Sequence, residues 1–273
     1  MKTILPLLLG LGITATTHAD NWCRHEADRT AAVDAAGVKK IVIGAGAGDL
    51  EVRGEAGLTR MQAKGRACAS GEDLLQEIQL ESRREGDTIY LKTVLPDTHG
   101  GILIPSHTLL DLRVAVPVAV AIELDDSSGD LKLEHVQSAV VNDSSGDIEI
   151  GDISGNLQVA DSSGDIDVQR VGGNLSISDS SGDITLTGVQ GSVEIPVDSS
   201  GDIRVTQAGS VLVHHDSSGG IVLRHVKGDV RVDSDSSGDI DVEDVGGNFT
   251  VGSDGSGDIH HTRVAGVVQL PPR

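Results

Sequence analysis

Aromatic side chains are almost absent from this sequence of 273 residues. Phe, Trp and Tyr occur once each and together make up 1% of the chain. Proteins that stack nucleic-acid bases need aromatic faces, and outer-membrane barrels carry aromatic girdles, so the composition argues against both classes. The hydrophobic residues, 38% of the chain, are therefore mainly aliphatic, and a core must be built from Val, Ile, Leu and Ala.

Positive charge is also scarce, with 21 Lys and Arg residues against 42 Asp and Glu residues and a formal net charge of −21. Nucleic-acid phosphates and anionic membrane surfaces repel such a chain, so we expect neither as a partner. The apolar content is nevertheless too high for a disordered acidic tail. The composition therefore indicates a folded, acidic protein.

Long apolar runs are missing except at the N-terminus, where Lys2 precedes an apolar stretch over residues 4–13. This pattern predicts a secretory signal at residues 1–19. The stretch is too short to span a membrane comfortably, so we expect a periplasmic or extracellular protein without membrane insertion. Cysteine occurs twice, and in an exported chain the pair Cys23 and Cys68 predicts one disulfide.

A repeated acidic unit is what the sequence does contain. Eight copies of Asp-Ser-Ser-Gly-Asp, two of them altered at one position, follow one another at steps of 17 to 19 residues. Their first residues are Asp126, Asp143, Asp161, Asp179, Asp198, Asp216, Asp235 and Asp254. This near-constant period indicates a repeat architecture, in which each unit buries its apolar face against its neighbours.

Each repeat divides into two halves of similar pattern, as residues 162–179 illustrate. A Gly-Asp or Gly-Asn pair precedes two aliphatic residues with one polar residue between them, such as Ile166 and Val168. The alternation predicts a short strand with one buried face, and the glycine pairs predict turns. We therefore expect an all-β fold, a parallel β-solenoid (β-helix) of about 18 residues per coil. A hexapeptide β-helix would need an aliphatic residue six positions after Ile166, where Gly172 stands, so we prefer a coil with two sheets.

The aliphatic residues of successive repeats are predicted to form inward-facing columns. The first sheet would contribute Ile148, Ile166, Ile184, Ile203, Ile221 and Ile240, with Ile150, Val168, Leu186, Val205, Leu223 and Val242 beside them. The second sheet would contribute Leu157, Leu175, Val193, Val211, Val230 and Phe249. A corner column would contain Val136, Ile153, Val171, Val189, Val226 and Val245.

Residues 20–125 do not follow this period. Alternating segments predict strands at residues 39–43, 48–52, 77–80, 88–92 and 110–117, and the second of them resembles half of a repeat. The open end of a solenoid is an unpaired edge that needs a cover. We therefore expect residues 20–125 to form a β-rich capping module, followed by solenoid repeats over residues 126–270.

A strand that ends at Val116-Pro117, followed by repeated Ser-Gly-Asp-Ile units and intervening Val-x-Gly-Asn-Leu segments, resembles the bacterial "putative adhesin" β-strand-repeat family. The resemblance covers roughly residues 38–270. It implies export, a β-solenoid and a role in binding at a surface, and it brings no catalytic residues with it.

The acidic units raise an electrostatic problem. Stacked coils would place equivalent Asp residues about 4.8 Å apart. Unit charges about 5 Å apart repel by about 0.8 kcal/mol even in water, and two columns would accumulate on the order of 10 kcal/mol. We expect Ser hydroxyls and turn N–H groups to donate to these carboxylates; the alternative is a hard cation such as Ca²⁺. The candidate metal ligands are Asp126, Asp130, Asp143, Asp147, Asp161, Asp165, Asp179, Asp183, Asp198, Asp202, Asp235 and Asp239.

The sequence contains no unique catalytic constellation. Paired carboxylates can hydrolyse glycosides, but they need separated pKa values, and here repetition makes many Asp residues equivalent. The His pairs at 214–215 and 260–261 are expected at exposed polar positions rather than on a metal. We therefore expect an exported, non-enzymatic, structural or adhesin-like module without a cofactor, whose partner is an unknown surface protein or glycan. The alternatives are a Ca²⁺-binding or cation-stabilised periplasmic protein and a glycan-active β-helix enzyme.

Overall fold

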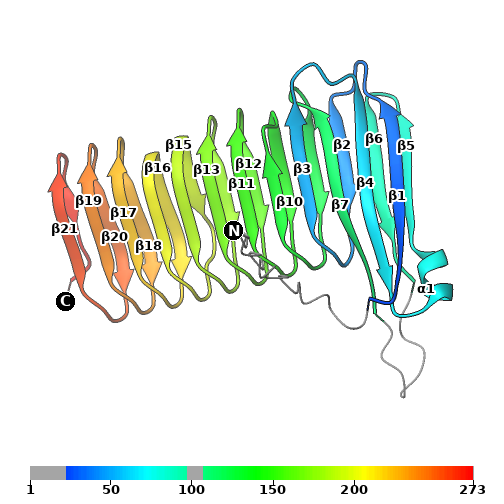
Figure 1. Ribbon diagram of the computed structural model, residues 1–273. Helices are drawn as coiled ribbons and strands as arrows, with labels where there is room; N and C mark the ends of the chain where they lie inside the picture. The colour runs from blue at the N-terminus through cyan, green and yellow to red at the C-terminus, as the bar shows by residue number, and fades with distance from the viewer. Residues whose placement is uncertain (1–22, 97–106, 273) are drawn as a thin grey trace, which may run out of the picture.

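The computed structural model describes residues 23–96 and 107–272 (Figure 1). The expected secretory signal at residues 1–19 lies outside this part of the chain. Short strands stand side by side along one axis, and the cap-like N-terminal strands lie at one end (Figure 1). This arrangement confirms the predicted parallel β-solenoid. No helix in the two described ranges is long and apolar enough to cross a membrane.

The solenoid has two parallel stacks, as predicted, and each coil contributes one strand to each stack. Sheet 1 contains β3 (Leu50–Glu55), β7 (Thr108–Pro117), β9 (Leu131–Glu134), β11 (Ile148–Ile153), β13 (Ile166–Val171), β15 (Ile184–Ile195), β16 (Ile203–Asp216), β17 (Ile221–Val226), β19 (Ile240–Val245) and β21 (Ile259–Val264). Sheet 2 contains β2 (Lys40–Gly44), β6 (Thr88–Val94), β8 (Ala121–Asp125), β10 (Ser138–Asn142), β12 (Leu157–Ala160), β14 (Leu175–Ser178), β18 (Val230–Asp235), β20 (Phe249–Asp254), β22 (Val268–Gln269) and the later parts of β15 and β16.

The register of the strands follows the sequence period. Ile166 pairs with Ile148 on one side and with Ile184 on the other, so like residues stack on like residues. Every residue predicted for the inward columns is buried. Burial of a side chain of this size contributes about 1.5–3 kcal/mol, and short strands obtain that contribution only by stacking.

The Ser-Gly-Asp turn needs its glycine. Gly164 has φ = 128°, a conformation that L side chains rarely adopt. A Cβ atom at this position would lie 1.9 Å from the carbonyl oxygen of Gly146 in the preceding coil. The turn can therefore stack at strand spacing only without a side chain.

Another corner uses the left-handed region with charged residues instead. The column of non-glycine residues with positive φ is His135, Asp152, Arg170, Gln207, His225, Asp244 and Arg263. Asp152 accepts two hydrogen bonds from the Arg170 guanidinium, at 2.6 and 2.9 Å, and lies 3.5 Å from His135 Nε2. The same His-Asp-Arg order recurs at the other end of the column, and these contacts help to hold the corner.

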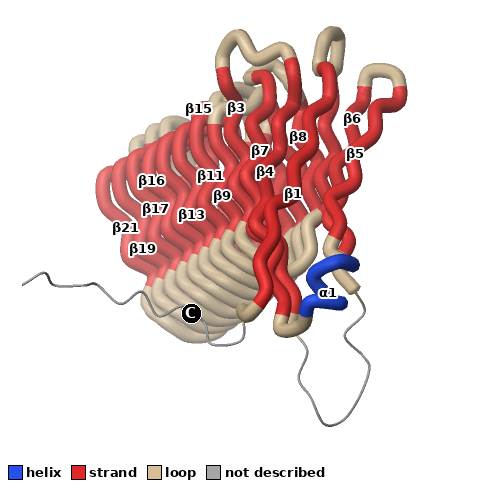
Figure 2. The backbone as a smooth tube through the Cα atoms, turned by 45° about the vertical axis from the view of Figure 1, so that its right-hand side comes forward, coloured by secondary structure: helices blue, strands red, loops and turns tan. Residues whose placement is uncertain are grey.

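The N-terminal region adds antiparallel strands to the stacks. β1 (His25–Asp34) pairs with β4 (Arg60–Ala69), which pairs with β7, and β5 (Gln79–Glu85) pairs with β6. β1, β4 and the short helix α1 (Glu72–Glu77) lie at the end of the solenoid opposite β21 (Figure 2). Cys23 and Cys68 form the predicted disulfide, with Cα atoms 5.6 Å apart.

Chain order and spatial order differ in this region. The coil of β2 and β3 lies between the coil of β6 and β7 and the coil of β8 and β9. Leu50 of β3 is in register with Leu131 of β9, which confirms that residues 48–52 form half of a repeat. The same two stacks therefore continue without a break on both sides of residue 126.

Candidate functional site

The second Asp of the units, together with Asp49 and Asp111 of the N-terminal region, forms an outer Asp row along the edge of sheet 1. Its members are Asp111, Asp49, Asp130, Asp147, Asp165, Asp183, Asp202, Asp239 and Asp258. The backbone N–H of Asp147 donates to Asp130 Oδ1 at 3.2 Å, and that of Asp183 donates to Asp165 Oδ1 at 2.9 Å. The row therefore hydrogen-bonds each coil to the next through one carboxylate oxygen, and it is interrupted only where Gly220 replaces the Asp.

The first Asp of each of the first seven units belongs to a different structure, the inner Asp column, whereas Asp254 of the eighth unit is only half-buried. Its members are Asp126, Asp143, Asp161, Asp179, Asp198, Asp216 and Asp235, and their exposed fractions lie between 0% and 6%. One oxygen of Asp161 accepts the N–H of Ser162 at 2.7 Å. Within the described residues, at least one oxygen of each member has no hydrogen-bond partner.

The Ser residues do not neutralise the inner column in the expected way. Turn N–H groups donate to the carboxylates as predicted, but the hydroxyl of the second Ser donates to a main-chain carbonyl of the preceding coil. Ser163 Oγ, for example, donates to the Ser144 carbonyl at 3.2 Å. The prediction that these hydroxyls donate to Asp was wrong, because the carbonyl of the neighbouring turn accepts them instead.

Burial and charge separate the two sets of carboxyls. Burial raises the pKa of Asp126 and Asp216 to about 7, and that of Asp161, Asp198 and Asp235 to about 6. In the outer row, the N–H of Asp202 and the guanidinium of Arg204 lower the pKa of Asp183. The pKa of Asp is thus raised at the inner position and lowered at the outer position of the unit that begins at Asp179.

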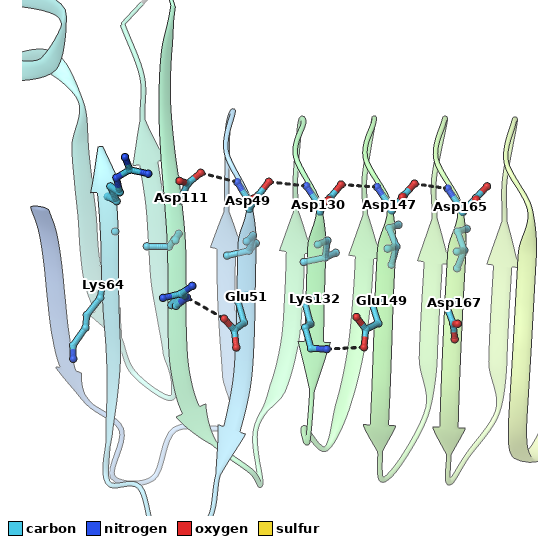
Figure 3. A pocket seen from close by; sticks show the side chains of 18 of the residues that line it. Asp49, Glu51, Lys64, Asp111, Asp130, Lys132, Asp147, Glu149, Asp165 and Asp167 are labelled. Atoms are coloured by element: carbon cyan, nitrogen blue, oxygen red, sulfur yellow. Dashed lines mark hydrogen bonds and ion pairs between the residues drawn. The ribbon is translucent and has the colours of Figure 1, made fainter. Parts of the chain in front are cut away.

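A groove of about 1180 Å³ runs over the exposed face of sheet 1, from β1 and β4 to β15. The outer Asp row lines it as a continuous series (Figure 3). A second series on the same face contains ion pairs: Arg113 Nε lies 3.1 Å from Glu51, and Lys132 Nζ lies 2.6 Å from Glu149 (Figure 3). The groove therefore presents one row of acids beside a mixed series of ion pairs and, within the described residues, unpaired charges such as Asp167.

Several acids of the groove form no ion pair among the described residues, and they include consecutive members of the outer row. Within the described residues, no Lys or Arg side chain forms an ion pair with Asp49, Asp130, Asp147 or Asp165. The row first meets a side-chain cation at Arg204, which lies 3.1 Å from Asp183. One oxygen of each of the four accepts a backbone N–H, so the negative charge of four adjacent coils stays available to a ligand.

The twelve residues predicted as metal ligands do not form one ladder. Six of them belong to the inner column and six to the outer row, so the two Asp residues of a unit lie in different surroundings. Among the described residues, no group of three or more His, Cys, Asp and Glu side chains is arranged to hold a metal ion. Calcium binding stays a prediction.

One cluster escaped the sequence analysis. His214 Nδ1 lies 2.9 Å from Asp233 and its Nε2 lies 3.0 Å from Glu194, so both ring nitrogens contact carboxylates. The hydrogen bond with Glu194 and then that with Asp233 raise the pKa of His214. The two partners lie in the coils before and after that of His214. The repeat period could have revealed them, because it sets which residues of neighbouring coils lie side by side.

The sequence matches the family model described as Toastrack DUF4097 over residues 34–243. The match confirms the family resemblance that the repeats indicated. No curated protein matched the chain.

Several solved structures are similar in fold. A "putative lipid binding protein" from Parabacteroides distasonis is 16% identical, with a TM-score of 0.48, and the match covers 90% of this chain and 97% of that one. A "putative adhesin" from Bacteroides fragilis is 14% identical, with a TM-score of 0.44 and coverage of 92% and 99%. A "putative cell adhesion protein" from Clostridium sporogenes is 11% identical, with a TM-score of 0.39 and coverage of 90% and 99%.

Proposed function

Since the chain belongs to the Toastrack DUF4097 family, we propose that it is an exported, non-enzymatic surface-interaction module that binds an extended, positively charged partner along the groove of sheet 1. The leader-like start of the sequence and the Cys23–Cys68 disulfide support export to an oxidising compartment. The observation that carries the binding role is the row of unpaired Asp side chains that crosses successive coils.

The groove favours a basic polymer for reasons of charge and repetition. Complementary charge speeds encounter and selects partners, and the acidic row offers a carboxylate at each coil step of about 4.8 Å. Each contact is exposed and weak, but several contacts on one extended chain add through multivalency. Among the possible surface partners, a protein segment rich in Lys and Arg therefore suits this face better than a neutral glycan.

The experiment measures binding of an oligolysine peptide to the full chain, with an oligoglutamate peptide of equal length as the negative probe. The groove variant is Asp130→Asn with Asp147→Asn, and the matched control is Asp239→Asn with Asp258→Asn. Both pairs remove two charges from the same row, and Asn at 130 and 239 keeps the oxygen that accepts the next N–H. Only the first pair lines the groove.

We expect the groove variant to bind oligolysine several-fold more weakly, while the control retains the affinity of the unmodified protein. Equal losses in the two variants would show that binding follows net charge alone, and the groove would then have no special role. Absence of binding by the unmodified protein would contradict the proposal directly.

Calcium binding by the outer row is the second candidate function. Carboxylate oxygens are ligands that Ca²⁺ prefers, and one oxygen of each outer Asp is free of the backbone hydrogen bond. Calorimetric titration with Ca²⁺ and the change in melting temperature test this function. A protein that shows neither heat nor a shift does not bind the ion.

A further inference from the structure

The inner Asp column places buried carboxyls of successive coils next to one another. Asp198 and Asp216 are bridged in parallel, and Asp216 is in register with Asp235 in the next coil. Like side chains therefore repeat at a strand spacing of about 4.8 Å. Neighbouring carboxyls are close enough for each to sense the charge of the next.

No positive group neutralises this column. The charged groups that act on its members are acids: other members of the column, Asp49 beside Asp126, Asp165 beside Asp179, Asp183 beside Asp198, and Asp254 beside Asp235. Asp125 and His215, which directly precede two members in the chain, are exposed. Within the described part of the chain, no Lys or Arg side chain forms an ion pair with any of the seven members.

The oxygens without a hydrogen-bond partner indicate how the cost of burying these carboxyls is removed. A buried carboxylate without a partner carries a large desolvation cost, and a row of them adds mutual repulsion. A carboxylic acid removes both costs, because it is neutral and its O–H can donate to an acceptor oxygen. The acceptors are present, since the next coil offers an oxygen that has no other donor.

We propose that the inner Asp column is a proton-binding site: its carboxyls take up protons on folding, and the O–H of one coil donates to the free oxygen of the next coil. Each proton comes from water on folding and returns to water on unfolding, so no other reactant is needed. The column then forms a ladder of carboxyl hydrogen bonds parallel to the backbone ladder. It stabilises the solenoid in acid, and this contribution is lost as the pH rises towards neutrality.

The direction of the pH effect follows from the pKa values. Burial raises the pKa of Asp198 to about 6 and that of Asp216 to about 7, above the ordinary value of 3.8. A group whose pKa is higher in the folded protein stabilises it fully below the ordinary value and loses that contribution as pH rises through the folded value. The loss therefore falls between about pH 4 and about pH 7, and the folded protein carries more protons than the unfolded chain in this window.

The experiment compares thermal unfolding of Asp198→Asn at pH 5 and pH 8 with that of the unmodified full chain. Asn has the shape of the neutral acid and can both accept and donate, but it cannot ionise. We expect the variant to raise the melting temperature by about 2–4 °C at pH 8 and by less at pH 5, where the carboxyl of the unmodified folded protein is still protonated. The matched control is Asp239→Asn in the outer row, which is expected to show no gain at pH 8.

A second measurement does not depend on any variant. The infrared spectrum of the unmodified protein shows protonated carboxyls by their carbonyl stretch, and we expect this band at pH 5 and its loss between pH 5 and pH 9. Absence of the band at pH 5 would overturn the proposal. So would a lower melting temperature of Asp198→Asn at pH 8 together with stabilisation of the unmodified protein by CaCl₂, because a cation would then hold the column in place of protons.

Discussion

Asp161 and Asp165 are separated by three residues of the same turn, yet they have opposite surroundings. Asp161 is 6% exposed and belongs to the inner column, whereas Asp165 is exposed and donates its N–H to the outer row while accepting the next one. Burial raises the pKa of Asp161 to about 6. The comparison shows that the two Asp residues of a unit have different roles. The inner Asp is buried where ionisation is unfavourable, and the outer Asp presents a negative charge at the surface.

The turn between the two Asp residues keeps them apart. Its glycine has a positive φ, which directs one carboxyl inwards and the other outwards along the groove. Because the turn repeats in successive coils, carboxyls that point the same way form a column or a row. The outer row and the inner column are therefore two consequences of one repeated backbone conformation.

The largest expected effect comes from breaking the turn that separates the two sets. Gly182 has φ = 140°, and a Cβ there would lie 1.8 Å from the carbonyl oxygen of Gly164. We expect Gly182→Ala to lower the free energy of unfolding by about 3 kcal/mol or more, because strain and a backbone clash combine. Urea unfolding at pH 7 measures the change.

The matched control for this substitution is Gly86→Ala. Gly86 also has a positive φ, of 62°, but a Cβ there meets nothing within 4 Å. We expect a loss of about 1 kcal/mol, from the left-handed conformation alone. Equal losses in the two variants would show that close stacking of the turns contributes nothing to stability.

The sequence predicted the repeated part of the molecule better than the unrepeated part. Eight copies of one unit made the period, the two sheets and the buried columns readable, because an error in one copy is corrected by the others. β1 and β4 escaped prediction since their inward residues include small ones such as Ala63 and Ala67, which give a weak alternation. The position of the β2–β3 coil between later coils could not be read from chain order.

The candidate site was predicted only in part. The period placed equivalent Asp residues on top of one another, and the turn N–H groups appeared as expected donors. The different burial of Asp161 and Asp165 was not readable, because both flank the same Ser-Ser-Gly segment and differ only in the direction that the turn gives them. The groove depends on β1 and β4, so it could not be expected without them.

A smaller effect tests the hydrogen bond that the outer row provides. Asp165→Ala removes the oxygen that accepts the Asp183 N–H at 2.9 Å, and we expect a loss of about 1 kcal/mol in the free energy of unfolding. Asp165→Asn keeps an acceptor and removes only a charge, so we expect a change within about 0.5 kcal/mol. Urea unfolding of both variants at pH 7 compares them, and equal losses would mean that charge rather than the acceptor matters.

The pH dependence contributed by Asp183 of the outer row should have the opposite sign to that of the inner column. The pKa of Asp183 is lowered, first by the N–H of Asp202 and then by Arg204. Its contribution is therefore present above the ordinary value of 3.8 and disappears as pH falls below it. We expect Asp183→Asn to cost no more than about 0.5 kcal/mol at pH 7, because the side chain is 47% exposed, and nothing at pH 3. An equal cost at pH 3 and pH 7 in urea unfolding would contradict this linkage.

The smallest expected change in stability concerns carboxylates that contact a histidine. These carboxylates have a third environment, different from those of the inner column and the outer row. His214 contacts Glu194 and Asp233, which raise its pKa, so its contribution is complete below pH 6.5 and is lost as pH rises through the folded value. We expect His214→Gln to lower stability by about 0.3–0.5 kcal/mol at pH 6 and by nothing measurable at pH 9. His215→Gln, on the exposed side of the same strand, is the control and should change little at either pH. A loss for His214→Gln that stays the same at pH 9 would assign the effect to packing, and the carboxylates would then differ by burial alone and not by the presence of a cation.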